Sequence, residues 1–186
     1  MIGYAFTGSF CTLGASLTEL EWLLSAGYDI LPIMSENVYT TDTRFYKAEE
    51  FIKKVETLCS HPIIHTVKDA EPLGAKSPLE YLIISPCTGN TLAKLANGIT
   101  DTPVTMAAKA HLRNGKPLII ALATNDAMSA NFKNIAVMLE KKNVYFVPLV
   151  QDDPAGKPSS LVADFEKIEE TVEYASRGIQ IRPLFL

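Results

Sequence analysis

Strand-sized apolar runs alternate with segments of helical periodicity along the whole chain. The apolar runs lie at 2–6, 28–34, 81–85, 117–123 and 144–149. Most of their positions are apolar, so both faces of each strand are expected to be buried. Such strands are typical of a parallel sheet that helices cover on both sides. The pattern therefore predicts an α/β protein with three layers, in which a parallel sheet lies between two layers of helices.

Between the strands, apolar residues recur at steps of three and four, which places them on one face of a helix. Stripes of this kind begin at Leu13, Phe51, Met128 and Leu161. Shorter helices are expected over 88–97 and 103–114, a minor strand over 63–67, and polar loops over 35–43, 70–78 and 151–160. Gly27 stands where the first helix needs a residue that adopts the left-handed conformation.

Length and composition narrow the class of protein. The 186 residues suit one domain spanning 1–186, and 47% hydrophobic residues suffice for a core. A formal charge of −4 with scattered basic residues gives no reason to expect nucleic acid. The first residues carry no basic stretch before a long apolar segment, so we expect neither a signal peptide nor a membrane span.

The three cysteines favour a reducing, cytoplasmic location. Cys11, Cys59 and Cys87 show no CxxC spacing, and the three histidines fit no metal-ligand pattern. These counts argue against a disulfide scaffold and against a metal site. We interpret Cys11 as a small core residue in the first helical turn.

The first candidate loop, Thr7-Gly8-Ser9, directly follows the first strand. In a parallel sheet, ligands bind beyond the carboxyl ends of the strands. Glycine permits a sharp turn, and the amide groups at the start of the following helix attract anions. The alternative is an ordinary helix cap by Thr7 or Ser9. The loop does not carry the GxGxxG pattern of dinucleotide-binding proteins.

The second candidate loop, residues 85–91, reads Ser-Pro-Cys-Thr-Gly-Asn-Thr. Pro86 is expected to end the strand because it cannot donate to a ladder. The small polar residues after it need hydrogen-bond partners, which either a ligand or the capping of the next helix would supply. Cys87 precedes a helix start, where the pKa of a thiol tends to fall.

Other polar loops at the same edge carry weaker signals. In the loop 124–126, Asn125 or Asp126 is expected to cap the next helix, and either could also touch a ligand. Asp101 is expected to cap the helix that follows it, with proline in the first turn. The residues 151–154, Gln-Asp-Asp-Pro, favour a turn over a metal site.

Together the two loops resemble those of the flavoprotein family that contains flavin-dependent cysteine decarboxylases and UbiX-like prenyltransferases. That family carries a TGS or SGS loop after its first strand and the segment P-x-(S/T)-x-N-T-x-x-K-x-A-x-G-x-x-D after a later strand. Residues 7–9 and 86–101 match these patterns. The resemblance implies a Rossmann-like fold of the flavin-decarboxylase type and a site for FMN, with the phosphate on backbone N–H groups.

The candidate cofactor-binding residues lie in these loops and in the loop after the fourth strand. They are Thr7, Gly8, Ser9, Pro86, Thr88, Asn90, Thr91, Thr124 and Asn125.

No residue is assigned a catalytic role. The decarboxylases carry a catalytic histidine just before the strand that here begins near Tyr81. This chain has Lys-Ser-Pro at 76–78 and no histidine between His65 and His111. The departure argues against decarboxylation of a cysteinyl peptide and leaves flavin binding open.

A closer resemblance, over nearly the whole chain, is to the family of dipicolinate synthase B subunits of spore-forming Firmicutes. The matching segments include 70–74, 95–97, 100–104, 106–110, 124–127 and 151–154. The resemblance implies that the chain works with an NADP-using, dehydrogenase-like A subunit. Together they would convert dihydrodipicolinate to dipicolinate in the cytoplasm of the mother cell during sporulation.

Two further implications come from the wider family. Its members assemble as trimers or dodecamers, so a homo-oligomer is expected. The alternative functions are an independent FMN-dependent decarboxylase or prenyltransferase, and a non-catalytic binding subunit of the same fold.

Overall fold

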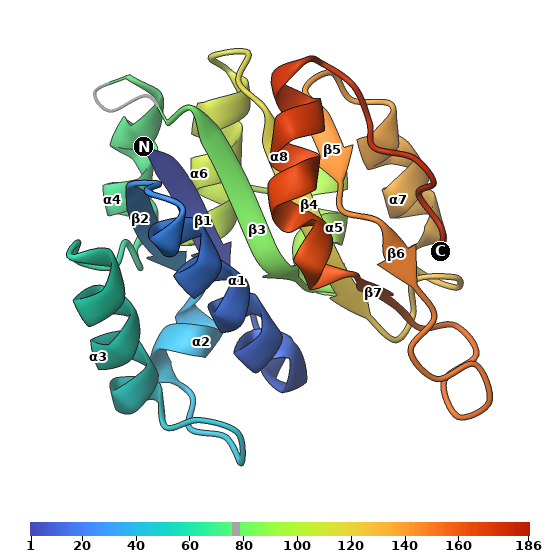
Figure 1. Ribbon diagram of the computed structural model, residues 1–186, viewed down its shortest axis with the longest axis horizontal. Helices are drawn as coiled ribbons and strands as arrows, with labels where there is room; N and C mark the ends of the chain where they lie inside the picture. Colours follow the sequence, from blue (N-terminus) through green and yellow to red (C-terminus); the bar gives the residue numbers. More distant parts are fainter. Residues whose placement is uncertain (76–78) are drawn as a thin grey trace.

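Five parallel strands form the centre of the sheet, in the order β2-β1-β3-β4-β5. The computed structural model describes residues 1–75 and 79–186. The strands are β1 (Ile2–Phe6), β2 (Ile30–Met34), β3 (Tyr81–Cys87), β4 (Leu118–Thr124), β5 (Val144–Phe146), β6 (Leu149–Val150) and β7 (Leu161–Ala163). The strand order reverses between β1 and β3, and their carboxyl ends point to the same edge in Figure 1. Ligands bind at such a switch point in sheets of this kind.

The sheet was predicted to be parallel, but it is not parallel throughout, because β7 runs antiparallel to β4. The short β5 pairs only with 118–120 of β4, and β7 pairs with Ala123 and Thr124 beyond it. The predicted strand over 144–149 is divided at Pro148, which cannot donate to a ladder. The residues from Leu161, which were predicted to begin a helix, therefore form the strand that pairs with the end of β4.

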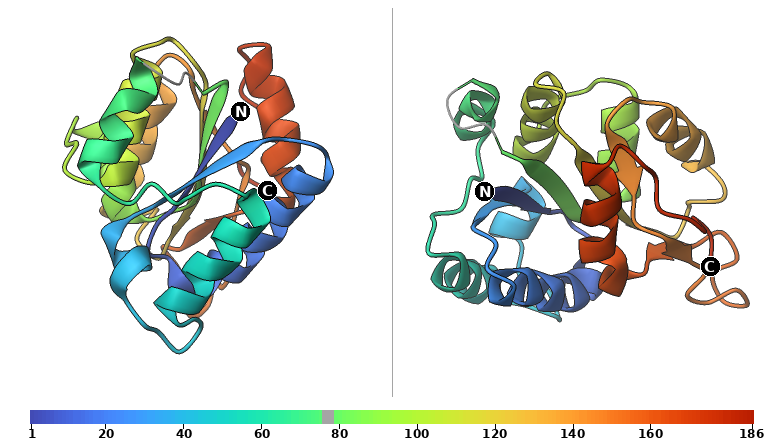
Figure 2. Two further views of the ribbon diagram at one scale, coloured as in Figure 1. Left: turned by 90° about the vertical axis from the view of Figure 1, so that its left-hand side faces the viewer. Right: turned by 45° about the horizontal axis from the view of Figure 1, so that its top comes forward.

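Two layers of helices cover the sheet (Figure 2). The helices α1, α3 and α8 lie on one face, and α4, α5, α6 and α7 lie on the other. Their bounds are α1 (Leu13–Ser25), α2 (Glu36–Thr40), α3 (Ala48–Cys59), α4 (Val67–Ala70), α5 (Gly89–Ala96), α6 (Pro103–Leu112), α7 (Phe132–Leu139) and α8 (Ile168–Ser176). Within the two described ranges, no helix has the length and apolar character to cross a bilayer.

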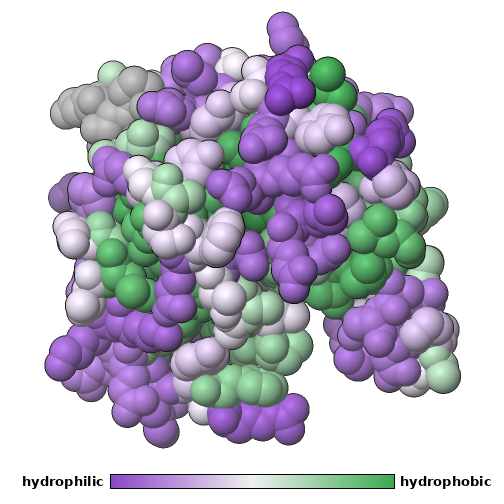
Figure 3. Space-filling model, in the orientation of Figure 1, coloured by the Kyte–Doolittle hydropathy of each residue, from purple (hydrophilic) through white to green (hydrophobic). Residues whose placement is uncertain are grey.

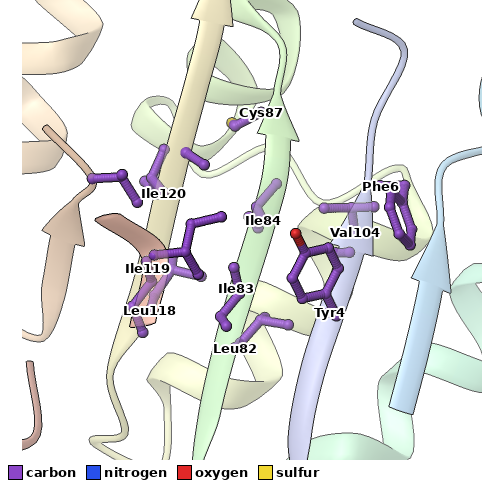
Figure 4. Packing of buried hydrophobic residues seen from close by; sticks show 14 of the residues in the cluster. Tyr4, Phe6, Leu82, Ile83, Ile84, Cys87, Val104, Leu118, Ile119 and Ile120 are labelled. Carbon is purple, nitrogen blue, oxygen red and sulfur yellow. The ribbon is translucent and has the colours of Figure 1, made fainter. Parts of the chain in front are cut away.

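The core lies against both faces of β3 and β4 (Figure 4). Ile84 and Ile120 on these strands are fully buried, as are most of their neighbours. On α1, Leu13, Leu17 and Leu20 of the predicted stripe are buried, whereas Leu24 is half-buried. Gly27 beyond the end of the helix has φ of +89°. The predicted alternation of apolar strands and one-sided helices is confirmed here. The loop 151–160, by contrast, projects from the body and is largely hydrophilic (Figures 1 and 3).

Several predicted loops and boundaries were wrong. The segment 35–43 contains α2, and 70–78 begins with the end of α4 and a 3-10 turn over Glu71–Gly74. The rest of that segment, 76–78, lies outside the described residues. Helices of four or five residues are too short to show an apolar stripe, so periodicity cannot reveal them.

Two other boundaries differ for local reasons. Of the predicted minor strand 63–67, Ile64 pairs with Ile33 as an isolated bridge. The helix expected from Met128 begins at Phe132, because hydrogen bonds to Asp126 hold the preceding residues in a turn.

A buried hydrogen-bond chain joins α1 to β1 and β3. The Tyr4 hydroxyl donates to the Ser16 carbonyl oxygen at 2.8 Å, and the Ser16 hydroxyl donates to the Ser85 carbonyl oxygen at 2.6 Å. All three residues are completely buried. Burial raises the pKa of the Tyr4 hydroxyl well above its usual value, so the hydroxyl stays protonated and continues to donate.

Replacing Tyr4 by phenylalanine should destabilise the protein by about 1–3 kcal/mol, because the Ser16 carbonyl oxygen loses a buried donor. The free energy of unfolding from a denaturant titration measures this loss. Tyr28→Phe, at a partly exposed tyrosine, is the matched control and should change stability by less than about 0.5 kcal/mol. Equal effects of the two changes would contradict a stabilising role for the buried chain.

Candidate functional site

The loops after β1 and β3 are joined by the side chain of Thr7. Its hydroxyl donates to the Pro86 carbonyl oxygen at 2.7 Å, and its amide donates to the same oxygen at 3.2 Å. The Thr88 amide donates to Thr7 Oγ1 at 2.9 Å. Thr7 is 1% exposed, so water competes little for these hydrogen bonds. The two loops therefore meet at one edge of the sheet, as the sequence predicts.

The strand β3 does not end at Pro86, which corrects the prediction. It continues to Cys87, and its register against β4 shifts between Ile84 and Cys87. An irregularity of this kind accommodates a residue that has no N–H for the ladder. The Pro86 carbonyl oxygen is then used by Thr7.

The first turn of α5 presents backbone donors at this edge. Thr88 is the N-cap, and its hydroxyl oxygen accepts from the Thr91 amide at 3.2 Å. A helix leaves its first amides without partners inside the helix, and Thr88 satisfies only that of Thr91. The amides of Gly89 and Asn90 thus lie at the positive end of the helix dipole. Capping by Thr88 is therefore observed, and it leaves the other amides of the first turn free for the predicted anion.

A cavity of about 540 Å³ lies at this edge, and we call it the switch-point cavity. Five of the predicted cofactor-binding residues line it, namely Thr7, Gly8, Thr88, Asn90 and Thr91. Of these, the hydroxyls of Thr7 and Thr88 are engaged inside the protein. Their side chains hold the loops together, and the donors left for a ligand are backbone amides, the Asn90 amide group and the Thr91 hydroxyl.

A third loop, after β2, contributes residues that sequence reasoning missed. Ser35 and Asn37 line the switch-point cavity. Ser35 Oγ is buried and has no hydrogen-bond partner among the residues that the structure describes. A buried hydroxyl without a partner costs free energy. Because Ser35 Oγ has almost no accessible surface, a ligand in the cavity would reach it only after a local shift of its neighbours. The rule that ligands bind beyond strand ends points to the loop after Met34 as well, but no residue in it was chosen as a site residue.

Gly8 leaves space in the cavity wall. The chain turns sharply at Gly8 as expected, since the Ser9 amide donates to the Thr7 carbonyl oxygen at 2.8 Å. The φ of Gly8 lies outside the left-handed region, so this turn does not require glycine. A Cβ atom at this position would meet Asn37 and Phe10 at 3.7 Å, which is ordinary contact. The backbone tolerates a side chain here, and its absence keeps the cavity open beside the loop amides.

Of the other four predicted residues, Pro86 lines neither the switch-point cavity nor the next. The remaining three, Ser9, Thr124 and Asn125, lie apart from the five. They line a separate cavity of about 110 Å³. The Ser9 hydroxyl accepts from the Thr12 hydroxyl at 2.9 Å and caps no helix amide, so the capping alternative is wrong for Ser9. The Thr124 hydroxyl donates to Asp126.

The loop after β4 also positions α5. A Cβ at Gly89 would come within 2.5 Å of Asn131 Nδ2 and 2.6 Å of Thr124 Oγ1. Only glycine therefore allows the first turn of α5 to approach this loop so closely. Asp126 receives hydrogen bonds from Thr124 and Asn131, and that from Thr124 holds the pKa of its carboxyl below the usual value.

A second cavity of about 400 Å³ adjoins the first, with which it shares Glu36, Asp101 and Thr102. We call it the aromatic cavity, because Tyr39 and His65 line it with their rings stacked at a centroid separation of 3.8 Å. His65 lies at the edge of the sheet because its neighbour Ile64 bridges to β2. Nothing in the sequence assigned His65 a catalytic role, and the structure brings it into the cleft.

The charges lining the switch-point cavity are unevenly distributed. Glu36 and Asp101 are acidic, and Lys94 is the cation of the described lining. Lys94 Nζ binds both carboxylate oxygens of Asp101, at 2.8 and 2.9 Å. Asp101 therefore does not cap α6 as predicted; Thr102 does, in a capping box with Thr105.

The remaining candidates have structural roles or none. Cys87 is fully buried, and burial raises the pKa of its thiol, contrary to the predicted fall. Cys11 is exposed, so its interpretation as a core residue was wrong. Of the segment 151–154, Asp153 and Pro154 begin a turn, in which Asp153 accepts from the Gly156 amide at 2.8 Å. Within the described ranges, no group of His, Cys, Asp and Glu is arranged to hold a metal ion.

Comparisons with known proteins place this geometry in a family. The model of the family described as Flavoprotein matches residues 1–176. The dipicolinate synthase B subunit of Bacillus subtilis (strain 168) is 42% identical over 185 residues, which cover 100% of this chain and 92% of that protein.

Two solved structures carry the likeness into three dimensions. The crystal structure of the dipicolinate synthase B subunit from Bacillus halodurans C superposes with a TM-score of 0.91 at 44% identity, covering 100% of this chain and 95% of that one. A dodecameric FMN-dependent UbiX-like decarboxylase from Escherichia coli O157:H7 gives a TM-score of 0.62 at 21% identity, covering 79% of each chain, and so shows the shared fold. The chain belongs to the flavoprotein family, in the branch of the dipicolinate synthase B subunits.

Proposed function

We propose that this chain acts as a dipicolinate synthase B subunit and binds FMN in the switch-point cavity. One observation carries the proposal: two loops locked together by Thr7 present backbone amides to a cavity lined also by Ser35, whose buried hydroxyl has no partner in the part of the chain that the structure describes. Donors gathered at the start of a helix suit a phosphate group. The 42% identity to the Bacillus subtilis protein supports the biological role.

The residues present fit the phosphate end of FMN. The Ser35 hydroxyl needs a partner, and the missing side chain of Gly8 leaves room beside the loop. The Gly89 and Asn90 amides add donors at the positive end of α5. The remainder of the ligand would extend toward the aromatic cavity, where Tyr39 and His65 offer a flat surface.

When bound, FMN would supply a ring that can accept a hydride, and the protein positions the reactants around it. Oxidation of dihydrodipicolinate to dipicolinate also releases a proton, and His65 is the group in the aromatic cavity suited to accept it. In this proposal the dehydrogenase-like A subunit binds NADP, which takes up the hydride at the end of each turnover and so leaves the flavin oxidised. The B subunit itself forms a homo-oligomer, a trimer or a dodecamer, as the dodecameric relative suggests.

An independent FMN-dependent decarboxylase is the second candidate function. The stretch 76–78, where the decarboxylase histidine was sought, lies outside the described residues. His65 favours this candidate because it brings an acid–base group into the cleft by another route. Turnover of the chain alone separates the two functions, since the decarboxylase needs no A subunit.

Asn90→Ala should weaken FMN binding about 5- to 150-fold, because the change removes a polar partner worth roughly 1–3 kcal/mol. Asn125→Ala is the matched control, since Asn125 is also exposed but lines the separate small cavity. Isothermal titration of each variant with FMN measures the two affinities. A larger loss in Asn125→Ala would move the ligand to the other cavity.

Gly8→Ala should leave the fold intact and reduce FMN affinity at least about tenfold. The added Cβ makes only ordinary contacts with the protein but narrows the cavity beside the loop amides. Thermal unfolding without ligand checks the fold, and FMN titration checks the site. Unchanged FMN affinity in a folded Gly8→Ala variant would remove Gly8 from the site.

The chain by itself should show little oxidation of dihydrodipicolinate, and addition of the A subunit with NADP should restore dipicolinate formation. The absorbance of dipicolinate follows the reaction. His65→Gln should lower the rate of the restored reaction while FMN affinity changes less than about threefold, because the proposed role is proton transfer. Full activity of the isolated chain would refute the requirement for an A subunit.

A further inference from the structure

The ion pair between Lys94 and Asp101 occupies an unusual position in the wall of the switch-point cavity. Lys94 lies on the same face of α5 as Asn90 and Thr91, since four and three residues separate them. All three line the cavity. The Lys94 side chain is 22% exposed, whereas the lysines of the other ion pairs are 44–62% exposed. Its ammonium group is therefore held at the cavity rather than free in solvent.

Asp101 holds this ammonium group from the cavity's rim. Both carboxylate oxygens bind Lys94 Nζ, and the hydrogen bond from Lys94 lowers the pKa of the Asp101 carboxyl. Asp101 itself is 58% exposed. Water therefore screens the pair on the carboxylate side, and such pairs are weak enough to exchange partners.

A phosphate in this cavity would lie near carboxylates as well as amides. Glu36 and Asp101 both line the cavity, and each repels an anion. Lys94 is the positive side chain in the described part of the lining. An anionic ligand therefore competes with Asp101 for the same ammonium group.

We propose that Lys94 is the cation that binds the terminal phosphate of the ligand, and that Asp101 stores its ammonium group until the phosphate arrives. This inference rests on the proposed function, because it names the group that recognises the phosphate in that same cavity. Asp101 positions Lys94. It also limits the affinity of the cavity for the phosphate, because the phosphate must displace the Asp101 carboxylate from the ammonium group. Affinity for phosphate esters then depends on the difference between two ion pairs.

Three variants of the full-length chain test the exchange, with FMN as the probe and riboflavin, which lacks the phosphate, as its matched control. Lys94→Met should weaken FMN binding about tenfold or more, because it removes a charge-assisted hydrogen bond. The same variant should leave riboflavin affinity unchanged. Lys94→Arg should restore most of the FMN affinity, since it restores the charge.

Asp101→Asn supplies the readout that a structural role would not produce. It should tighten FMN binding by up to about fivefold, because the stored ammonium group is released from an exposed pair. The double variant Lys94→Met, Asp101→Asn should bind FMN as weakly as Lys94→Met alone. Thermal unfolding without ligand checks that each variant is folded.

Specific results would overturn the exchange. Weaker or unchanged FMN binding in Asp101→Asn would show that the pair only braces the turn after α5. Equal losses for FMN and riboflavin in Lys94→Met would show that Lys94 does not meet the phosphate. If the wild-type chain binds FMN but the variants do not show the predicted changes in affinity, the proposed function stands without this inference. If the wild-type chain does not bind FMN, both are removed.

Discussion

The Thr7 hydroxyl group is the point on which the proposed site depends. It donates to the Pro86 carbonyl oxygen and accepts from the Thr88 amide, and so fastens the end of β1 to the end of β3 across 79 and 81 residues of sequence. The parallel pairing of these two strands brings the loops into range. Thr7 then fixes their relative position, which sets where the amides of α5 lie relative to Gly8.

The surrounding elements serve the same arrangement in different ways. The buried hydrogen bonds from Tyr4 to Ser16 and from Ser16 to Ser85 tie α1 to both strands. Beside the loops, the turn after β4 packs against Gly89 and allows α5 to begin close to the sheet. The loop after β2, which contains Ser35, forms a third side of the switch-point cavity. The loops that surround the cavity all follow strand ends, so the polar groups gather where the sheet reverses its order.

Sequence patterns predicted the parts of this arrangement that repeat or that follow a rule. The strands and long helices were recognised because apolar periodicity spans many residues, and the loops after β1 and β3 because polar residues directly follow apolar strands. The antiparallel β7 was missed because its pairing depends on the short length of β5, which no local pattern encodes. The short helices α2 and α4 leave too few residues for periodicity to detect.

The site was predicted in part for similar reasons. The sequence reveals which residues follow a strand but not which way they face, so Ser9 and Thr124 were grouped with residues that line another cavity. Ser35 and His65 were missed because their significance comes from burial and from position beside distant segments. Cys87 was misjudged because its burial, not the nearby helix start, controls the pKa of its thiol.

The central claim is that the joined loops and the start of α5 hold the phosphate of a flavin nucleotide. A crystal structure of the full chain soaked with FMN tests it most directly. Difference density for the phosphate should lie between Gly8 and the first turn of α5, with an oxygen atom within hydrogen-bond distance of Ser35 Oγ. Phosphate density in the small cavity beside Ser9 and Asn125, with the switch-point cavity filled only by solvent, would contradict the account.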